Sequence, residues 1–160
     1  MLAKESVFAY NPIDVVENIF GAKSFDLERR NSNEVVIEMQ GKWKEMLIFF
    51  AWEENIKCLQ ISCFIDIEVN TTDKSKIFEL LALANSDLWM GHFSYWSEQN
   101  MPVFKHSVIL SEDKNMFAGK IEQMISIAVK ECERMYPIFY AVLTKDADPK
   151  SIMSPTEVLM

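Results

Sequence analysis

The strongest constraint on the fold is a run of strand-like segments between residues 25 and 67. Residues 25–30, 34–39, 43–52 and 58–67 are apolar at regular positions, and short turns rich in Asn, Gly and Glu separate them. Apolar side chains at every second position, clearest in 34–39 and 58–67, are typical of β-strands. The pattern predicts four antiparallel strands that follow one another in sequence order, a four-strand meander.

The third of these segments, Trp43–Trp52, is apolar on both faces. One face carries Leu47 and Phe49, and the other carries Met46, Ile48 and Phe50. Strands with this pattern are normally covered on both sides. We therefore expect the second face of the sheet, with Met46, Phe50 and Trp52, to need a further cover. A subunit interface or a protein partner would provide it.

Helices are expected on both sides of the strand block. Asn11 as N-cap and Pro12 as the first helical residue begin one helix, and Gly21 ends it. A second helix is expected to begin at Thr72 or Asp73, followed by apolar residues at helical spacing.

A hairpin and a long helix follow. The hairpin comprises residues 92–97 and 101–110, with its turn at 98–100. The helix starts near Asn115, and we expect Pro137 to kink or end it because proline has no N–H. The order α-β-β-β-β-α-β-β-α predicts an α+β fold, a twisted antiparallel sheet with helices packed on it.

The length of 160 residues predicts one domain. We place it at residues 11–143, after an N-terminal extension of residues 1–10. Residues 144–160 contain two prolines and are expected to form a loosely held C-terminal tail with one short helix.

The formal net charge of −8 argues against nucleic acid and the anionic membrane surface as partners. The longest unbroken apolar run, Met46–Trp52, is too short for a membrane helix, which needs about 20 residues. The first ten residues contain no apolar core of the length a signal peptide has. We therefore expect a cytoplasmic protein.

The sequence contains no recognisable catalytic or cofactor-binding motif. Cys58, Cys63 and Cys132 lack the spacing of a zinc site and are expected to be reduced thiols. Cys58 and Cys63 lie on opposite faces of one predicted strand and cannot bridge each other. We expect no cofactor, no metal and no enzymatic activity.

Two histidines in the hairpin provide an alternative. If the turn is centred on Gln99, His92 and His106 lie opposite each other on one face. If it is a two-residue Gln99-Asn100 turn, they lie on opposite faces. Together with Tyr95, a pair on one face could form a small-ligand or metal sensor with a pocket near residues 91–110. The simpler interpretation is two separate polar residues.

The main functional expectation is a protein-binding module, chaperone-like or regulatory. Aromatic side chains gather where the second helix meets the hairpin, as they do at recognition surfaces or at an ordinary hydrophobic corner. The residues expected to bind a protein client are Trp52, Trp89, Trp96, Phe50 and Met46.

Several stretches resemble a known family. They are residues 11–17, 80–85, 88–93, 102–107 and 131–137. Their sequences are NPIDVVE, LLALAN, LWMGHF, PVFKHS and ECERMYP. Together they are similar to the YbjN domain family of bacteria, members of which are described as sensory transduction regulators, and in particular to its alphaproteobacterial branch.

This resemblance covers about residues 11–144 and implies a fold like that of type III secretion chaperones. Proteins of that kind are small, often form homodimers, and hold an unfolded or extended partner. The resemblance implies a role in regulation or stress responses and no catalytic residues. The polar, proline-containing tail departs from the regular terminal helix that the family leads us to expect.

Overall fold

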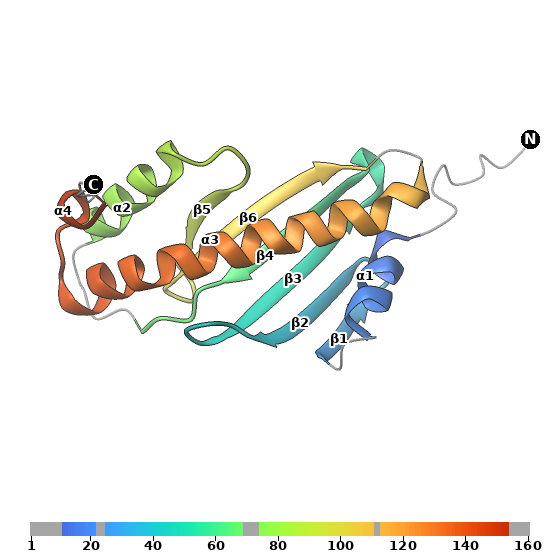
Figure 1. Ribbon diagram of the computed structural model, residues 1–160, viewed down its shortest axis with the longest axis horizontal. Helices are drawn as coiled ribbons and strands as arrows, with labels where there is room; N and C mark the ends of the chain where they lie inside the picture. The colour runs from blue at the N-terminus through green and yellow to red at the C-terminus, as the bar shows by residue number, and fades with distance from the viewer. Residues whose placement is uncertain (1–10, 22–24, 69–73, 111–112, 154–160) are drawn as a thin grey trace, which may run out of the picture.

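The computed structural model describes residues 11–21, 25–68, 74–110 and 113–153 (Figure 1). It contains one six-stranded antiparallel sheet with helices packed on it, which confirms the predicted α+β class. The elements are α1 (Pro12–Gly21), β1 (Asp26–Asn31), β2 (Glu34–Gln40), β3 (Glu45–Glu53), the 3-10 helix η1 (Glu54–Ile56), β4 (Cys58–Phe64), α2 (Lys74–Ser86), β5 (His92–Trp96), β6 (Met101–Ile109), the 3-10 helix η2 (Lys114–Met116), α3 (Phe117–Lys145) and α4 (Pro149–Met153).

The strands lie in the order β1-β2-β3-β4-β6-β5. The first four form the predicted meander, and the hairpin adds β6 beside β4 and β5 at the edge. Trp96 pairs with Met101, so residues 97–100 form the hairpin turn. Asn100 has a positive φ of 50° there, a conformation that asparagine tolerates well.

The helices that contact the sheet pack on one of its faces, the inner face (Figure 1). The long helix α3 crosses this face, α1 lies at the β1 end, and α2 and α4 lie at the opposite end. Alternate strand residues such as Ile48, Ile61 and Phe104 meet Phe139 of α3 in a continuous core, and all four are fully buried.

The start of α1 is as predicted. The side-chain oxygen of Asn11 accepts a hydrogen bond from the backbone N–H of Ile13 at 2.9 Å, which satisfies one of the free N–H groups of the first turn. The residues predicted to cap the second helix, Thr72 and Asp73, lie outside the described part of the chain.

The expectation that Pro137 could end the third helix is wrong, because α3 continues to Lys145. Pro137 lacks the N–H that would bond to the carbonyl of Glu133, four residues earlier. That carbonyl instead accepts a hydrogen bond from the indole Nε1–H of Trp43 at 2.9 Å. A tertiary contact thus replaces the missing helical bond.

The expectation of a loosely held tail is also corrected in part. The predicted short helix exists as α4, but it packs on α2, with Pro149 buried and Ile152 against the core. An ion pair of 2.7 Å between Lys76 and Asp146 holds the connection before it. Residues 154–160 lie outside the described part of the chain, and the domain boundary at residue 143 stays a prediction.

Candidate functional site: the outer face of the sheet

The outer face of the sheet is the one opposite the helices. The side chains of Met46, Phe50 and Trp52 are at most 7% exposed and point into the core on the inner face, so their predicted place on an uncovered face is wrong. The β3 residues on the outer face are instead Leu47, Phe49 and Ala51 (the β2–β3 and β3–β4 pairings place them). The alternation fixed which side chains share a face, but both faces are apolar and the pattern cannot choose between them.

Aromatic rings cross this face obliquely from strand to strand. The guanidinium of Arg30 lies 5.1 Å from the ring centroid of Phe49. The centroids of Phe49 and Phe64 are 5.1 Å apart, as are those of Phe64 and Trp96. We call Arg30, Phe49, Phe64 and Trp96 the aromatic row. Such edge-to-face and tilted contacts order the rings in advance of any binding event.

The outer face combines partly exposed apolar side chains with buried ones. Leu47 and Trp96 are each 38% exposed, whereas Val103, beside Phe64 on the same face, is 1% exposed. Within the described residues no helix packs on this face. Leu47, Phe49, Phe64 and Trp96 therefore form an apolar strip that a partner's side chains can cover.

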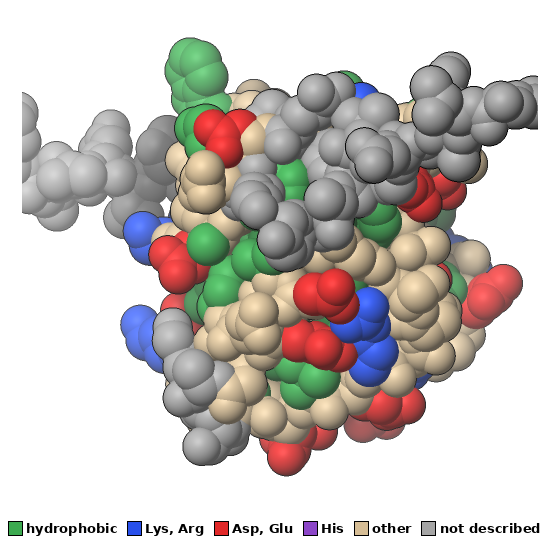
Figure 2. Space-filling model, turned by 90° about the vertical axis from the view of Figure 1, so that its right-hand side faces the viewer, with side chains coloured by type: hydrophobic (Ala, Val, Ile, Leu, Met, Phe, Trp, Pro, Cys, Tyr) green, Lys and Arg blue, Asp and Glu red, His purple; other side chains and the backbone are tan. Residues whose placement is uncertain are grey.

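Carboxylates flank the strip on one side. Those on the outer face of β1, β2 and β3 are Asp26, Glu28, Glu34, Glu38, Glu45 and Glu53. The basic side chains of the outer face are Arg30 and Lys105. Figure 2, which looks onto the end of the molecule where α1 lies, likewise shows more acidic than basic side chains.

At the sheet edge formed by β5, the backbone groups of Phe93 already have hydrogen-bond partners. The side-chain amide of Asn85 donates to the carbonyl of Phe93 at 2.9 Å, and its oxygen accepts from the N–H of Phe93 at 2.6 Å. These two bonds imitate a neighbouring strand and occupy the groups that strand addition needs. A strand added at this edge would therefore have to displace the Asn85 side chain, whereas the outer face carries no such contact from a described helix.

The two remaining predicted anchors are both exposed. Trp96 belongs to the aromatic row, while Trp89 lies in the connection between α2 and β5 and is 99% exposed. Sequence reasoning missed Arg30, Phe49 and Phe64 as surface residues. The signal for Phe49 was present in the two-sided pattern of the third segment, but the face with Met46, Phe50 and Trp52 was the one expected to need a further cover.

The predicted histidine pair does not converge. His92 pairs with Lys105, so it faces outward, whereas His106 is the next residue along β6 and is buried on the inner face. The β5–β6 pairing is centred between Glu98 and Gln99, so it matches neither the turn centred on Gln99 nor the two-residue Gln99-Asn100 turn. The second of these nevertheless placed the two histidines correctly on opposite faces. The two imidazoles cannot share a ligand, and this removes the geometric basis of a metal or ligand pocket between them.

His106 is nevertheless an unusual core residue. Among the described residues, its buried Nε2 atom has no hydrogen-bond partner. Burial lowers the pKa of His106, and the nearby charge of His92 lowers it further. The neutral imidazole is therefore the form that the fold accommodates.

We expect His106 to make the fold less stable in acid. The unfolded chain, with an ordinary histidine pKa of about 6.5, binds the proton more readily than the folded one, so stability falls as the pH drops below about 6.5. Urea unfolding at pH 7.5 and pH 5 should show that His106→Leu gains stability over the wild type at the lower pH. His92→Leu is the control. An equal gap between wild type and His106→Leu at both pH values would contradict the prediction.

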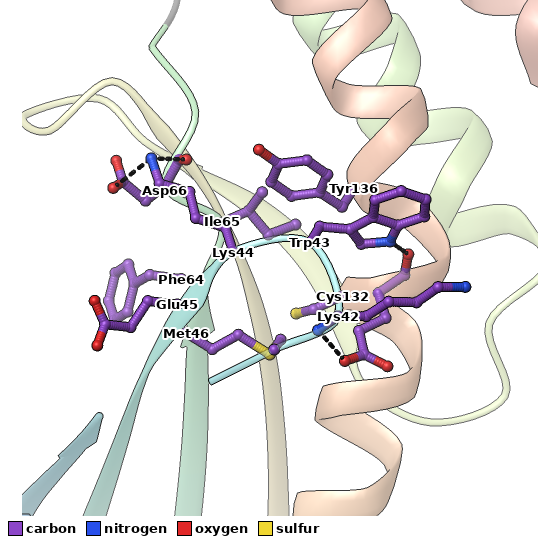
Figure 3. A pocket seen from close by; sticks show the side chains of 12 residues that line it. Lys42, Trp43, Lys44, Glu45, Met46, Phe64, Ile65, Asp66, Cys132 and Tyr136 are labelled. Carbon is purple, nitrogen blue, oxygen red and sulfur yellow. Dashed lines mark hydrogen bonds and ion pairs between the residues drawn. The ribbon is translucent and has the colours of Figure 1, made fainter. Parts of the chain in front are cut away.

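A small recess lies on the inner side, between the β2–β3 turn and α3 (Figure 3). The ring of Trp43 stacks on that of Tyr136 with centroids 6.2 Å apart, and Lys44 pairs with Asp66 at 2.9 Å. The recess encloses about 20 Å³, which is room for about one water molecule. It is a packed joint between hairpin and helix and not a ligand site.

The described residues include no cluster of three or more His, Cys, Asp or Glu side chains able to hold a metal. Cys63 and Cys132 are both buried, and the Sγ of Cys132 lies 3.9 Å from the carbonyl oxygen of Cys63. The hydrogen bond to Cys63 and burial raise the pKa of Cys132, which keeps this thiol protonated. In the described part of the chain no helix is long and apolar enough to span a membrane.

Comparison with solved structures gives a match to a chain of the crystal structure of the ExsC-ExsE complex. The TM-score is 0.57 at 11% identity, over 78% of this chain and 90% of that chain. With the sheet and helices described above, this defines an α+β protein with a type III secretion chaperone-like fold.

The family model YbjN, described as "Putative bacterial sensory transduction regulator", matches residues 12–141. The chain belongs to the YbjN family, as its sequence stretches led us to expect. No curated protein matches the chain.

Proposed function

We propose that this chain is a non-enzymatic, protein-binding regulatory module that binds its partner on the outer face of the sheet. The observation that carries the proposal is the aromatic row on a face that no described helix covers. The family description as a regulator supports it, and so does the structural neighbour, which is part of the ExsC-ExsE complex. We propose further that the protein acts in the cytoplasm as a homodimer.

The test is capture of cross-linked partners by the tagged protein in its own cells. Trp96→Ala removes the exposed end of the aromatic row, and truncation of an aromatic hot-spot residue at an interface costs about 2 kcal/mol or more. We expect a partner captured by the wild type to be reduced about tenfold or more.

Met116→Ala is the matched control, because Met116 is a large exposed apolar residue outside the sheet, immediately before α3. Capture by this variant should equal capture by the wild type. Trp89→Ala tests whether the other exposed tryptophan contributes. Retention of every partner by Trp96→Ala would overturn the proposed surface. Light scattering of the purified protein tests the homodimer separately.

A further inference from the structure

Among the described residues, four carboxylates on the outer face have neither an ion pair nor a hydrogen-bond donor. They are Asp26, Glu28, Glu38 and Glu45. Two of them, Asp26 and Glu38, face each other directly across the β1–β2 pair. Like charges in that position destabilise a sheet. The arrangement therefore costs the isolated protein stability that a cationic neighbour would restore.

The same carboxylates adjoin the apolar strip. Glu38 pairs directly with Leu47 in the β2–β3 register, and Glu45 lies two residues before Leu47 on the same face of β3. Phe64 of the aromatic row is the neighbour of Leu47 on β4. The face thus presents an apolar strip bordered by negative charge on the side of β1 and β2.

The backbone requirements of a partner favour a helix. The face of a sheet offers side chains but no unpaired N–H or C=O groups, and the Asn85 amide occupies both backbone groups of Phe93 at the β5 edge. A helix satisfies its own backbone groups and packs readily on a sheet face. An extended segment would leave its backbone groups unpaired there.

We infer that the outer face binds a basic amphipathic helix of a partner protein. This inference rests on the proposed function and specifies the partner's chemistry. Apolar side chains of the helix cover Leu47, Phe49, Phe64 and Trp96, and lysines or arginines along one side of it meet the carboxylates of β1, β2 and β3.

The probe is a fluorescent 18-residue Leu/Lys peptide of amphipathic helical pattern, with a Leu/Glu peptide of the same pattern as its counterpart. Binding to the full chain is measured by anisotropy at 0.05 M and 0.5 M salt. We expect the Leu/Lys peptide to bind and the Leu/Glu peptide not to bind. The affinity of the Leu/Lys peptide should be lower at high salt, because salt screens the attraction between its lysines and the carboxylates.

Reversing the charge of outer-face carboxylates tests whether the peptide binds on that face. Glu38→Lys with Glu45→Lys should weaken Leu/Lys binding on the order of tenfold at low salt. The control, Asp87→Lys with Glu122→Lys, changes the net charge equally at exposed positions on the helical side and should change affinity about twofold or less. Equal weakening by both pairs, no Leu/Lys binding, or equal binding of both peptides would overturn the inference.

The cellular capture separates this inference from the proposed function. A partner lost with Trp96→Ala but retained by Glu38→Lys with Glu45→Lys would overturn the basic helix and leave the protein-binding surface standing. A partner retained with Trp96→Ala but lost with the charge reversal would overturn the aromatic row as the binding surface. Loss with both variants and retention by the Asp87 and Glu122 control supports both.

Discussion

Gly91→Ala should lower the free energy of unfolding by about 2–5 kcal/mol. Gly91 lies just before β5 with a positive φ of 74°, a conformation that a side chain disfavours. A Cβ atom there would overlap the ring of Phe104 and lie 2.9 Å from the backbone oxygen of Lys105. Phe104 is fully buried and packs on Phe93 with centroids 5.3 Å apart, so its ring has no room to move.

Gly119→Ala is the matched control. Gly119 lies in α3, and a Cβ atom added there meets nothing within 4 Å. Alanine is the better helix former, so this variant should gain about 0.5–1 kcal/mol. Urea unfolding measures both changes from the shift of the midpoint at an unchanged slope.

If Gly91→Ala proves too unstable to measure, Gly91→Ala with Phe104→Leu provides a second route. The smaller leucine opens space for the new Cβ, so the double variant should be more stable than Gly91→Ala alone and fold well enough to be measured. A Gly91→Ala variant as stable as the wild type would contradict the close packing at this position.

The sheet was predictable to the extent that local patterns decide it. The four-strand meander, the Asn11 cap and the burial of alternate residues such as Leu59 and Ile61 all follow from spacing and residue type. Each depends on neighbours a few positions away in the sequence.

The features that were missed depend on distant contacts. Phe49 and Phe50 are equally apolar neighbours, and only the packing of α1 and α3 decides that Phe50 is in the core. The faces of His92 and His106 depend on the length of one turn, where a change of one residue reverses them. The aromatic row joins side chains from four strands, so no single segment of the sequence displays it.

At Pro137 a contact with a distant residue, Trp43, allows a helix to continue where the local sequence predicts a kink or an end. We expect Pro137→Ala to stabilise the protein by about 1–3 kcal/mol. Proline inside a helix costs about 3 kcal/mol through its missing N–H and its clash with the preceding turn. The hydrogen bond from Trp43 to the Glu133 carbonyl already offsets part of this, so the gain should fall below the full amount.

Trp43→Phe tests that compensation directly. Phenylalanine keeps an aromatic ring that can stack on Tyr136 but has no N–H to donate, so the Glu133 carbonyl loses its partner. We expect a loss of about 0.5–1.5 kcal/mol in the wild-type background. The backbone N–H of Lys42 still bonds to the Glu133 carboxylate at 2.9 Å, so the hairpin stays in contact with α3.

The decisive measurement is the double-mutant cycle by urea unfolding. In Pro137→Ala the new backbone N–H bonds to the Glu133 carbonyl, so Trp43→Phe should cost less there than in the wild type. The expected coupling is about 0.5–1.5 kcal/mol. Lys42→Ala, with its backbone N–H intact, is the control and should show no coupling to Pro137. Additive effects of Trp43→Phe and Pro137→Ala would mean that the indole hydrogen bond does not compensate for the N–H that proline lacks. Core packing alone would then explain why α3 continues past Pro137.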